Sequence, residues 1–233
     1  QSNRMMRTLL EWLPIQRLQP MRSARPQHGR MLDMARGVIK PIPLDQIPAD
    51  YVATAEMMDR LVGDATTIQV LAHSIPATDF YFKDFYQQMF YNGRPGLTVA
   101  VREKQLVRLR ISKRHGCALC NRNNEEEILD YGFNQDQVDA LFDLNPDASL
   151  FTDAELALIG LTDQMVLDNQ EGRLDEALYA RLRRHLSDEQ IVEVSLVAAM
   201  LVGAGKLTFV LDLVPREATC TMPAPVRQLA AAE

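Results

Sequence analysis

The sequence predicts an all-α protein, a bundle of helices preceded by an extended basic arm. Three observations carry this prediction. From Pro48 onward the hydrophobic residues recur at helical spacings. Asn134, Thr152 and Ser187 stand where helix N-caps are expected, just ahead of acidic residues, and Thr152 with Glu155 fits a capping box. No segment alternates apolar and polar residues convincingly enough to predict a strand.

The composition is that of an ordinary globular protein. The chain has 233 residues, of which 47% are hydrophobic and 24% are charged, enough for a real core. Six of the twelve prolines fall before residue 50, which argues against a packed domain there. We therefore expect an extended arm over residues 1–47, a helical domain over 48–215 and a tail over 216–233.

The predicted arm is strongly basic. Residues 1–40 carry eight Arg and Lys against two acidic residues, a charge of +6, which leaves −12 for the rest of a chain whose net charge is −6. Such an arm is suited to lie across an acidic neighbouring subunit. Nucleic acid is the alternative partner, but Trp12 is the only aromatic side chain in the arm on which a base could stack, which argues against it.

Three cysteines are too few for a disulfide-stapled secreted scaffold, and the sequence shows no apolar signal-peptide core near its start. A reducing, cytoplasmic setting is therefore expected, with Cys220 as an idle thiol or an intermolecular disulfide partner. The apolar run 194–205 is shorter than the ~20 residues that span a bilayer, so it predicts a core helix and no membrane. The sequence has no glycine-rich phosphate loop, HExxH or GxSxG, and no cofactor is expected.

The helices are expected in the following order. Apolar stripes over 52–62 and 68–72 come first, and Pro76 forces a break after them. Aromatic residues between 77 and 91 recur at helical spacings, a pattern typical of core. The helix over 101–115 is expected to bury its aliphatic residues and to keep a heavily basic outer face. A long, nearly all-apolar helix over 191–213 closes the domain.

Two cysteines, Cys117 and Cys120, lie one helical turn apart. Gly116 is expected to end one helix and Cys117 to begin the next, so the first sulfur lies where unpaired N–H groups and the helix dipole stabilise a thiolate. A pair with this spacing can close a small disulfide ring. Zinc would need four ligands, and His115 is the only further candidate nearby. A redox-active dithiol is therefore favoured, with an inert buried pair as the alternative.

The stretch QLVRLRISKRHGCALC, with LAHSIPATDFYFKDFYQQMF before it and NEEEILDYGF after it, resembles the alkylhydroperoxidase D and carboxymuconolactone decarboxylase superfamily. The resemblance covers most of residues 68–213. It implies an all-α bundle that assembles into dimers, trimers or hexamers. It also implies a peroxidase that reduces a hydroperoxide with electrons from an external thiol reductant. In that scheme Cys120 attacks the peroxide and Cys117 resolves the sulfenic acid into a redox-active disulfide.

The sequence departs from the family pattern at the proton relay. The pattern has a glutamate twelve residues before the first cysteine and a histidine four after the second, and here these positions hold Gln105 and Asn124. Both keep hydrogen-bonding capacity but cannot titrate, so turnover is expected to fall by the roughly 10²- to 10⁴-fold that a positioned base contributes. Glu127 is two turns from Cys120, ~10.5 Å along the helix, beyond direct contact. His115 is left as the candidate substitute base, or as an exposed histidine that ends its helix.

Two functions follow from these observations. The first is a thiol-dependent hydroperoxide reductase or disulfide oxidoreductase that is weakened by the changed relay. The alternative is a non-catalytic, oligomeric member of the same fold that binds a small molecule or a partner. Lactone decarboxylation is disfavoured, because that branch of the superfamily is expected to lack the dithiol. The apolar surface of 77–91 and 191–213 exceeds what one bundle needs, which predicts a homo-oligomer in either case.

Overall fold

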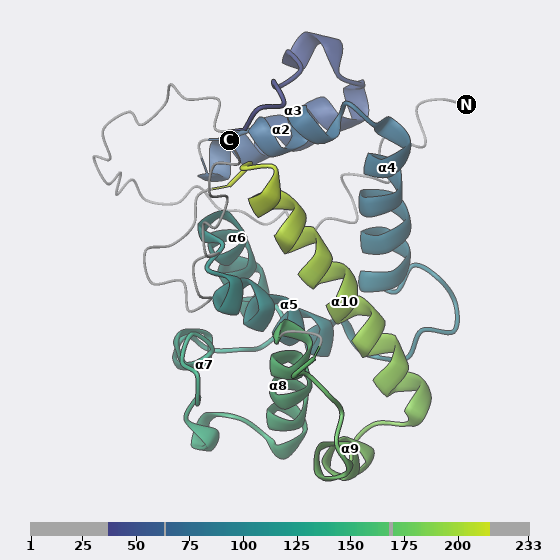
Figure 1. The fold of residues 1–233 in the computed structure, drawn as a ribbon, viewed down its shortest axis with the longest axis vertical. Helices are drawn as coiled ribbons and strands as arrows, with labels where there is room; N and C mark the ends of the chain where they lie inside the picture. Colours follow the sequence, from purple (N-terminus) through teal and green to yellow (C-terminus); the bar gives the residue numbers. More distant parts are fainter. Residues whose placement is uncertain (1–36, 63, 168–169, 215–233) are drawn as a thin grey trace, which may run out of the picture. The chain divides into compact units, whose positions relative to one another are not determined.

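The computed structural model describes residues 37–62, 64–167 and 170–214, and within these ranges it is helical and contains no strand (Figure 1). The chain forms two compact units, Gln1–His73 and Ser74–Glu233. Most of the predicted basic arm, and the tail with Cys220, lie outside the described residues. The division of the chain into arm, domain and tail therefore stays a prediction.

The described part of the first unit contains the short 3-10 helix η2 (Leu44–Gln46) and the helices α2 (Ala49–Val62) and α3 (Thr66–Leu71). The Gln69 side chain donates a hydrogen bond to the carbonyl oxygen of Ile42, at 2.9 Å. The His73 ring makes a 2.9 Å hydrogen bond with the carbonyl oxygen of Lys40. These contacts tie the segment before η2 to α3, and they give His73 a structural role on an exposed position.

The second unit carries the cysteines. Its elements are α4 (Ile75–Asp79), η3 (Phe80–Phe90), α5 (Val101–His115), α6 (Ala118–Leu129), α7 (Gln135–Ala140), η4 (Ala148–Leu150), α8 (Asp153–Val166), α9 (Glu176–Arg183) and α10 (Asp188–Val210). Asn134, Thr152 and Ser187 cap α7, α8 and α10, each in a full capping box, which confirms all three predicted N-caps. Pro76 lies in the first turn of α4, so the expected break precedes this helix.

Helix α5 is the centre of the second unit. It packs against α6, α8 and α10, and Figure 1 shows it behind α8 and α10. The prediction of a basic outer face for this helix was wrong, because most of its basic side chains are buried along with its aliphatic ones: Lys104, Arg108, Arg110, Lys113 and His115 are all at most 9% exposed. The Arg102 side chain, at the start of the helix, is the most exposed of them, at 37%. Its neighbours α6, α8 and α10 cover most of the helix, so each buried charge needs a partner inside the protein.

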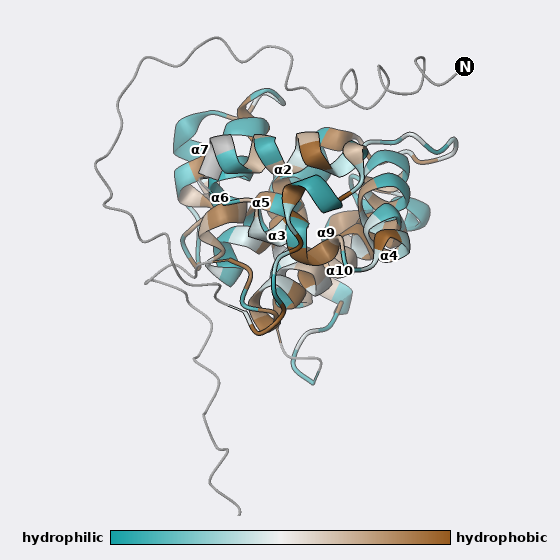
Figure 2. Cartoon of the chain, turned by 90° about the horizontal axis from the view of Figure 1, so that it is seen from above, coloured by the Kyte–Doolittle hydropathy of each residue, from teal (hydrophilic) through white to brown (hydrophobic). Residues whose placement is uncertain are grey.

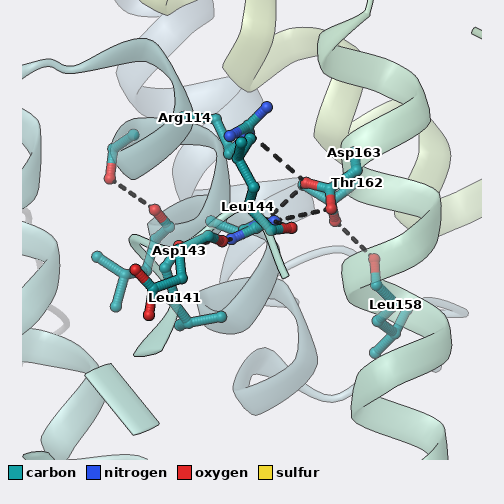
Figure 3. Close-up of polar contacts among 10 residues, drawn as sticks. Arg114, Leu141, Asp143, Leu144, Leu158, Thr162 and Asp163 are labelled. Carbon is teal, nitrogen blue, oxygen red and sulfur yellow. Dashed lines mark hydrogen bonds and ion pairs between the residues drawn. The ribbon is translucent and has the colours of Figure 1, made fainter. Parts of the chain in front are cut away.

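Arg110 shows how such a charge is accommodated. Its guanidinium is fully buried and binds the Asp163 carboxylate through Nε and Nη2, both at 2.8 Å. Its remaining N–H groups donate to three carbonyl oxygens after α7, those of Leu141, Asp143 and Leu144, at 2.6–3.2 Å. Figure 3 shows these three residues facing Asp163 of α8. The side chain therefore holds the α7–η4 segment against α8, with charge and hydrogen bonds both satisfied.

The aromatic segment is a π-helix. Over η3, the eleven residues Phe80–Phe90 hydrogen-bond with the wider π repeat, which places Phe85 and Phe90 in the core. Lys104 lies against the end of this helix, where its ammonium donates to the carbonyl oxygen of Met89 at 2.8 Å. The same ammonium pairs with Glu193 of α10 at 2.6 Å. The expectation that the aromatic cluster is core holds for its buried members, whereas Phe80 is 54% exposed.

Helix α10 has one buried and one exposed apolar face. Ile191, Val194 and Val197 pack in the core, whereas Val192 and Leu196 are 67% and 52% exposed. By length and composition the helix could cross a membrane, with 23 residues, a mean hydropathy of 1.7 and a third of its apolar window buried. Its hydrophobic colouring is visible in Figure 2. The sequence predicted a core helix, and the core takes up one side of it.

Candidate dithiol site

Cys117 and Cys120 lie where α5 turns into α6. Gly116 ends α5 in the left-handed conformation, with φ of 64°, which glycine adopts without strain. Cys117 is the N-cap of α6, and its sulfur accepts a hydrogen bond from the backbone N–H of Cys120 at 3.2 Å. The two sulfurs form a disulfide, and the Cα atoms are 5.2 Å apart. Cys117 is 1% exposed, whereas Cys120 is partly exposed, so an approaching reagent meets Cys120 first.

A polar seam runs away from the cysteines between α5 and α6. The backbone N–H of Cys117 donates to the carbonyl oxygen of Ser112, and the Ser112 hydroxyl accepts from the Asn124 side chain at 3.1 Å. Asn124 is 6% exposed. This side chain, at the position where the family pattern has a histidine, therefore fixes the packing of α6 on α5 and is not hydrogen-bonded to either sulfur.

One turn further along the seam, Glu127 is the centre of a buried cluster. One of its carboxylate oxygens accepts from the Gln105 amide at 2.6 Å and from the Tyr91 hydroxyl at 2.5 Å. The other pairs with Arg108 at 2.6 Å. The side chain of Glu127 is 15% exposed and that of Arg108 only 5%. The Gln105 amide therefore donates to a carboxylate on the neighbouring helix. Gln105 stands where the family pattern has a glutamate, so the carboxylate of Glu127 lies directly beside that position.

The surroundings of the cluster raise the pKa values of both Arg108 and Tyr91. Burial alone disfavours the charged guanidinium, but the Glu127 carboxylate outweighs that cost and raises the pKa of Arg108. Burial raises the pKa of Tyr91 well above its usual value, and the hydrogen bond to Glu127 adds to this effect. The Arg108 guanidinium also lies over the Phe90 ring, at 5.0 Å from its centre. Near neutral pH the cluster is thus an ion pair with a neutral tyrosine.

His115 is buried, 1% exposed, and so is not the exposed histidine considered as its alternative role. Its ring packs against α10, where a side chain in place of Gly205 would come within 2.6 Å of Nδ1 and where the Phe209 ring lies edge-on at 6.4 Å. Burial, together with the positive charges of Lys206 and Arg114, lowers the pKa of His115 to about 4. A group with that pKa is a weak base at neutral pH, which argues against His115 as the substitute in the relay.

The same burial predicts a pH-dependent stability. Above pH ~6.5 the histidine is neutral in both the folded and the unfolded chain, whereas between pH ~6.5 and 4 only the unfolded chain binds the proton. The protein is therefore expected to lose roughly 3 kcal/mol through His115 over this window as the pH falls. Urea unfolding at a series of pH values should show this component in the wild type and not in His115→Gln. Parallel stability curves for the two proteins would contradict it.

Three residues of the seam, Arg108, Ser112 and Glu127, were not predicted as site residues. Spacing offered one signal, since Asn124 and Glu127 follow Cys120 by four and seven residues and so share its face of α6. Their α5 partners gave none. Among the described residues, no group of three or more His, Cys, Asp and Glu side chains is placed to hold a metal ion.

Comparison with known sequences gives a partial match. No family model matches the chain. The uncharacterised protein YdfG of Bacillus subtilis strain 168 is 26% identical over 94 residues, which are 40% of this chain and 63% of that protein. The match thus spans less than two thirds of this relative's length.

Solved structures are similar over much more of the chain. The alkylhydroperoxidase AhpD core of an uncharacterised peroxidase-related protein from Ralstonia eutropha JMP134 is 17% identical, with a TM-score of 0.52 over 79% of this chain and 95% of that one. The debrominase Bmp8, in complex with 2,3,4-tribromopyrrole, is 16% identical, with a TM-score of 0.56 over 80% and 95%. The chain has the alkylhydroperoxidase D-like fold, which confirms the predicted fold class.

Proposed function

We propose that the chain is a thiol-dependent hydroperoxide reductase or disulfide oxidoreductase of the alkylhydroperoxidase D and carboxymuconolactone decarboxylase superfamily. The observation that carries the proposal is the disulfide between Cys117 and Cys120 at the start of α6, in which Cys120 is the more exposed residue. The fold by itself does not choose the reaction, because a debrominase has it too.

The chemistry needs only the two thiols and an external reductant. The Cys120 thiolate attacks the outer oxygen of the hydroperoxide, the O–O bond breaks, and the alkoxide that leaves takes up a proton to become an alcohol. The Cys117 thiol then displaces water from the Cys120 sulfenic acid and forms the disulfide. A separate dithiol returns two electrons and two protons and becomes a disulfide itself. This cycle suits the reducing, cytoplasmic setting expected from the sequence.

The proposal is tested by oxidation of the reduced protein. A stoichiometric amount of hydroperoxide should remove two protons' mass from the peptide that contains Cys117 and Cys120, and dithiol reductant should restore it, as followed by mass spectrometry. Alkylation before the peroxide is added is the control. Thiols that persist through peroxide treatment would favour the alternative, a non-catalytic oligomer that binds a small molecule or a partner. The observation in favour of this alternative is that Gln105 and Asn124, at the relay positions, cannot titrate.

Native turnover should be slow, and restoring titrating groups should raise it. The double variant Gln105→Glu with Asn124→His would place a carboxylate beside Glu127, where the two acids share a proton, and an imidazole on the Cys120 face of α6. We expect hydroperoxide consumption to rise at least tenfold, about 1.4 kcal/mol of barrier. Initial rates over a range of pH measure this. A folded double variant with the wild-type rate would show that proton transfer does not limit turnover.

We further propose that the protein works as a homo-oligomer that uses the exposed face of α10. The stripe consists of apolar or small residues three or four positions apart: Val192, Leu196, Ala199, Gly203, Leu207 and Val210. Val210 is 80% exposed, and a stripe of this length on water is a liability unless another surface covers it. Light scattering should give a dimer, trimer or hexamer that Leu196→Glu weakens. A 26.3 kDa monomer at micromolar concentration would contradict the proposal.

A further inference from the structure

We propose that the Arg108–Glu127 ion pair controls the dithiol electrostatically: Glu127 cancels the charge of Arg108 and so sets how readily Cys120 ionises. The inference rests on the proposed function, in which Cys120 is the attacking thiol. Glu127 touches neither sulfur, so it is not a catalytic residue. It acts at a distance, by cancelling the charge of Arg108. Its effect on Cys120 does not need hydroperoxide to be observed.

The geometry places the ion pair on the same seam as the dithiol. Cys120, Asn124 and Glu127 recur at spacings of four and three, so they share the face of α6 that packs on α5. On α5, Ser112 contacts both Cys117 and Asn124, and Arg108 lies one turn before it. Glu127 is about 10.5 Å from Cys120 along the helix axis. Along the seam between Cys120 and Glu127 lie Asn124 and Ser112, two uncharged side chains that are hydrogen-bonded to each other.

Hydrogen bonds and burial fix the position of the Arg108–Glu127 ion pair. Three donors, the Gln105 amide, the Tyr91 hydroxyl and the Arg108 guanidinium, converge on the Glu127 carboxylate at 2.5–2.6 Å. Arg108 is 5% exposed and Glu127 15%, so water screens neither charge well. Removal of one partner therefore leaves an uncompensated charge buried in the seam with the thiols.

Other charges near the dithiol are compensated or more solvated. Lys113 pairs with Glu125, whose side chain is 36% exposed. Arg114 lies 3.9 Å from the Asp163 carboxylate of α8 (Figure 3), and Lys206 of α10 is exposed beside the His115 ring. The remaining charged side chains of α6 near the cysteines are the exposed Arg122 and Glu126. The Arg108–Glu127 pair is thus the most deeply buried charge pair on the cysteine face of α6 among the described residues.

Loss of Glu127 and loss of Arg108 should shift the midpoint of Cys120 ionisation in opposite directions. Glu127→Gln leaves the positive charge of Arg108, which stabilises the thiolate, and Arg108→Gln leaves the negative charge of Glu127, which destabilises it. At a separation near 10 Å and an effective dielectric constant near 20, each change is expected to shift the midpoint of ionisation by about one pH unit. A more stable thiolate favours the reduced state, so Glu127→Gln should also make the disulfide more oxidising and Arg108→Gln less so.

The test is the pH profile of Cys120 alkylation in the fully reduced, full-length protein. Short pulses of iodoacetamide, read peptide by peptide in a mass spectrometer, separate Cys120 from the other thiols. We expect the midpoint to move down by about one pH unit in Glu127→Gln and up by about one in Arg108→Gln. Glu127→Asp and Arg108→Lys keep the charges and should restore midpoints close to the wild type. Glu126→Gln, which removes an exposed carboxylate from the same helix, is the control and should shift the midpoint far less.

Midpoints that stay at the wild-type value, or that move in the same direction in both neutralised variants, would overturn the inference and make the pair purely structural. A shift in Glu126→Gln as large as that in Glu127→Gln would overturn it too. If Arg108→Gln does not fold, as judged by circular dichroism, the comparison of Glu127→Gln with Glu127→Asp decides. A wild type that never consumes hydroperoxide would disprove the hydroperoxide reductase activity while leaving these midpoints measurable.

Discussion

Replacement of Arg110 by methionine is expected to destabilise the protein by about 3–5 kcal/mol, a large part of the stability of an ordinary domain. The guanidinium is fully buried and has five hydrogen bonds, two to Asp163 and three to the carbonyl groups that follow α7. Methionine would fill much of the space, but it would leave three carbonyl oxygens without their donor and the Asp163 carboxylate with only the longer contact to Arg114, at 3.9 Å. Loss of one partner from a buried ion pair costs more than the pair contributes when intact.

The matched control is Arg184→Met, which removes the same kind of side chain from the same kind of contact on the surface. Arg184 is 60% exposed and pairs with Asp153 at 2.8 Å. The expected cost is below about 1 kcal/mol, because water and salt screen the pair and a flexible side chain is ordered to make it. Urea unfolding of both variants measures the difference. Equal losses would show that burial of Arg110 carries no special weight.

Arg110 also shows where the sequence stops predicting the fold. The helix over 101–115 and its end at Gly116 follow from local signals, namely periodicity and a residue that tolerates positive φ. Its basic residues were expected to face water. Most of them do not, because the partners that allow their burial come from distant positions, such as Asp163, 53 residues along the chain. Local sequence carries no sign of such pairing.

The site divides in the same way. The place of Cys117 at the start of α6, and the disulfide it forms with Cys120, follow from residues that are neighbours in sequence. The environment of His115 depends on α10, which packs Gly205 and Phe209 against the ring from some ninety residues away. The role of Glu127 depends likewise on Arg108 and Tyr91. The position of the proposed nucleophile, Cys120, at the start of α6 was therefore predictable, but the charged groups around it were not.

Cys120→Ser is expected to abolish hydroperoxide consumption outright, because serine has no thiolate and Cys117, 1% exposed at the N-cap, is shielded from the peroxide. Cys117→Ser should behave differently. Cys120 would still attack once, and its sulfenic acid, with no neighbouring thiol to resolve it, should accumulate as a mass gain of one oxygen that a sulfenic acid probe captures.

Single-turnover peroxide assays with mass spectrometry separate the two variants. The expected pattern is no oxygen added to the Cys117 peptide in Cys120→Ser and about one oxygen per chain on Cys120 in Cys117→Ser, followed by overoxidation as peroxide is raised. The reverse pattern would exchange the roles of attacking and resolving thiol. It would also require a movement that opens Cys117 to the peroxide, because this residue is 1% exposed at the N-cap of α6.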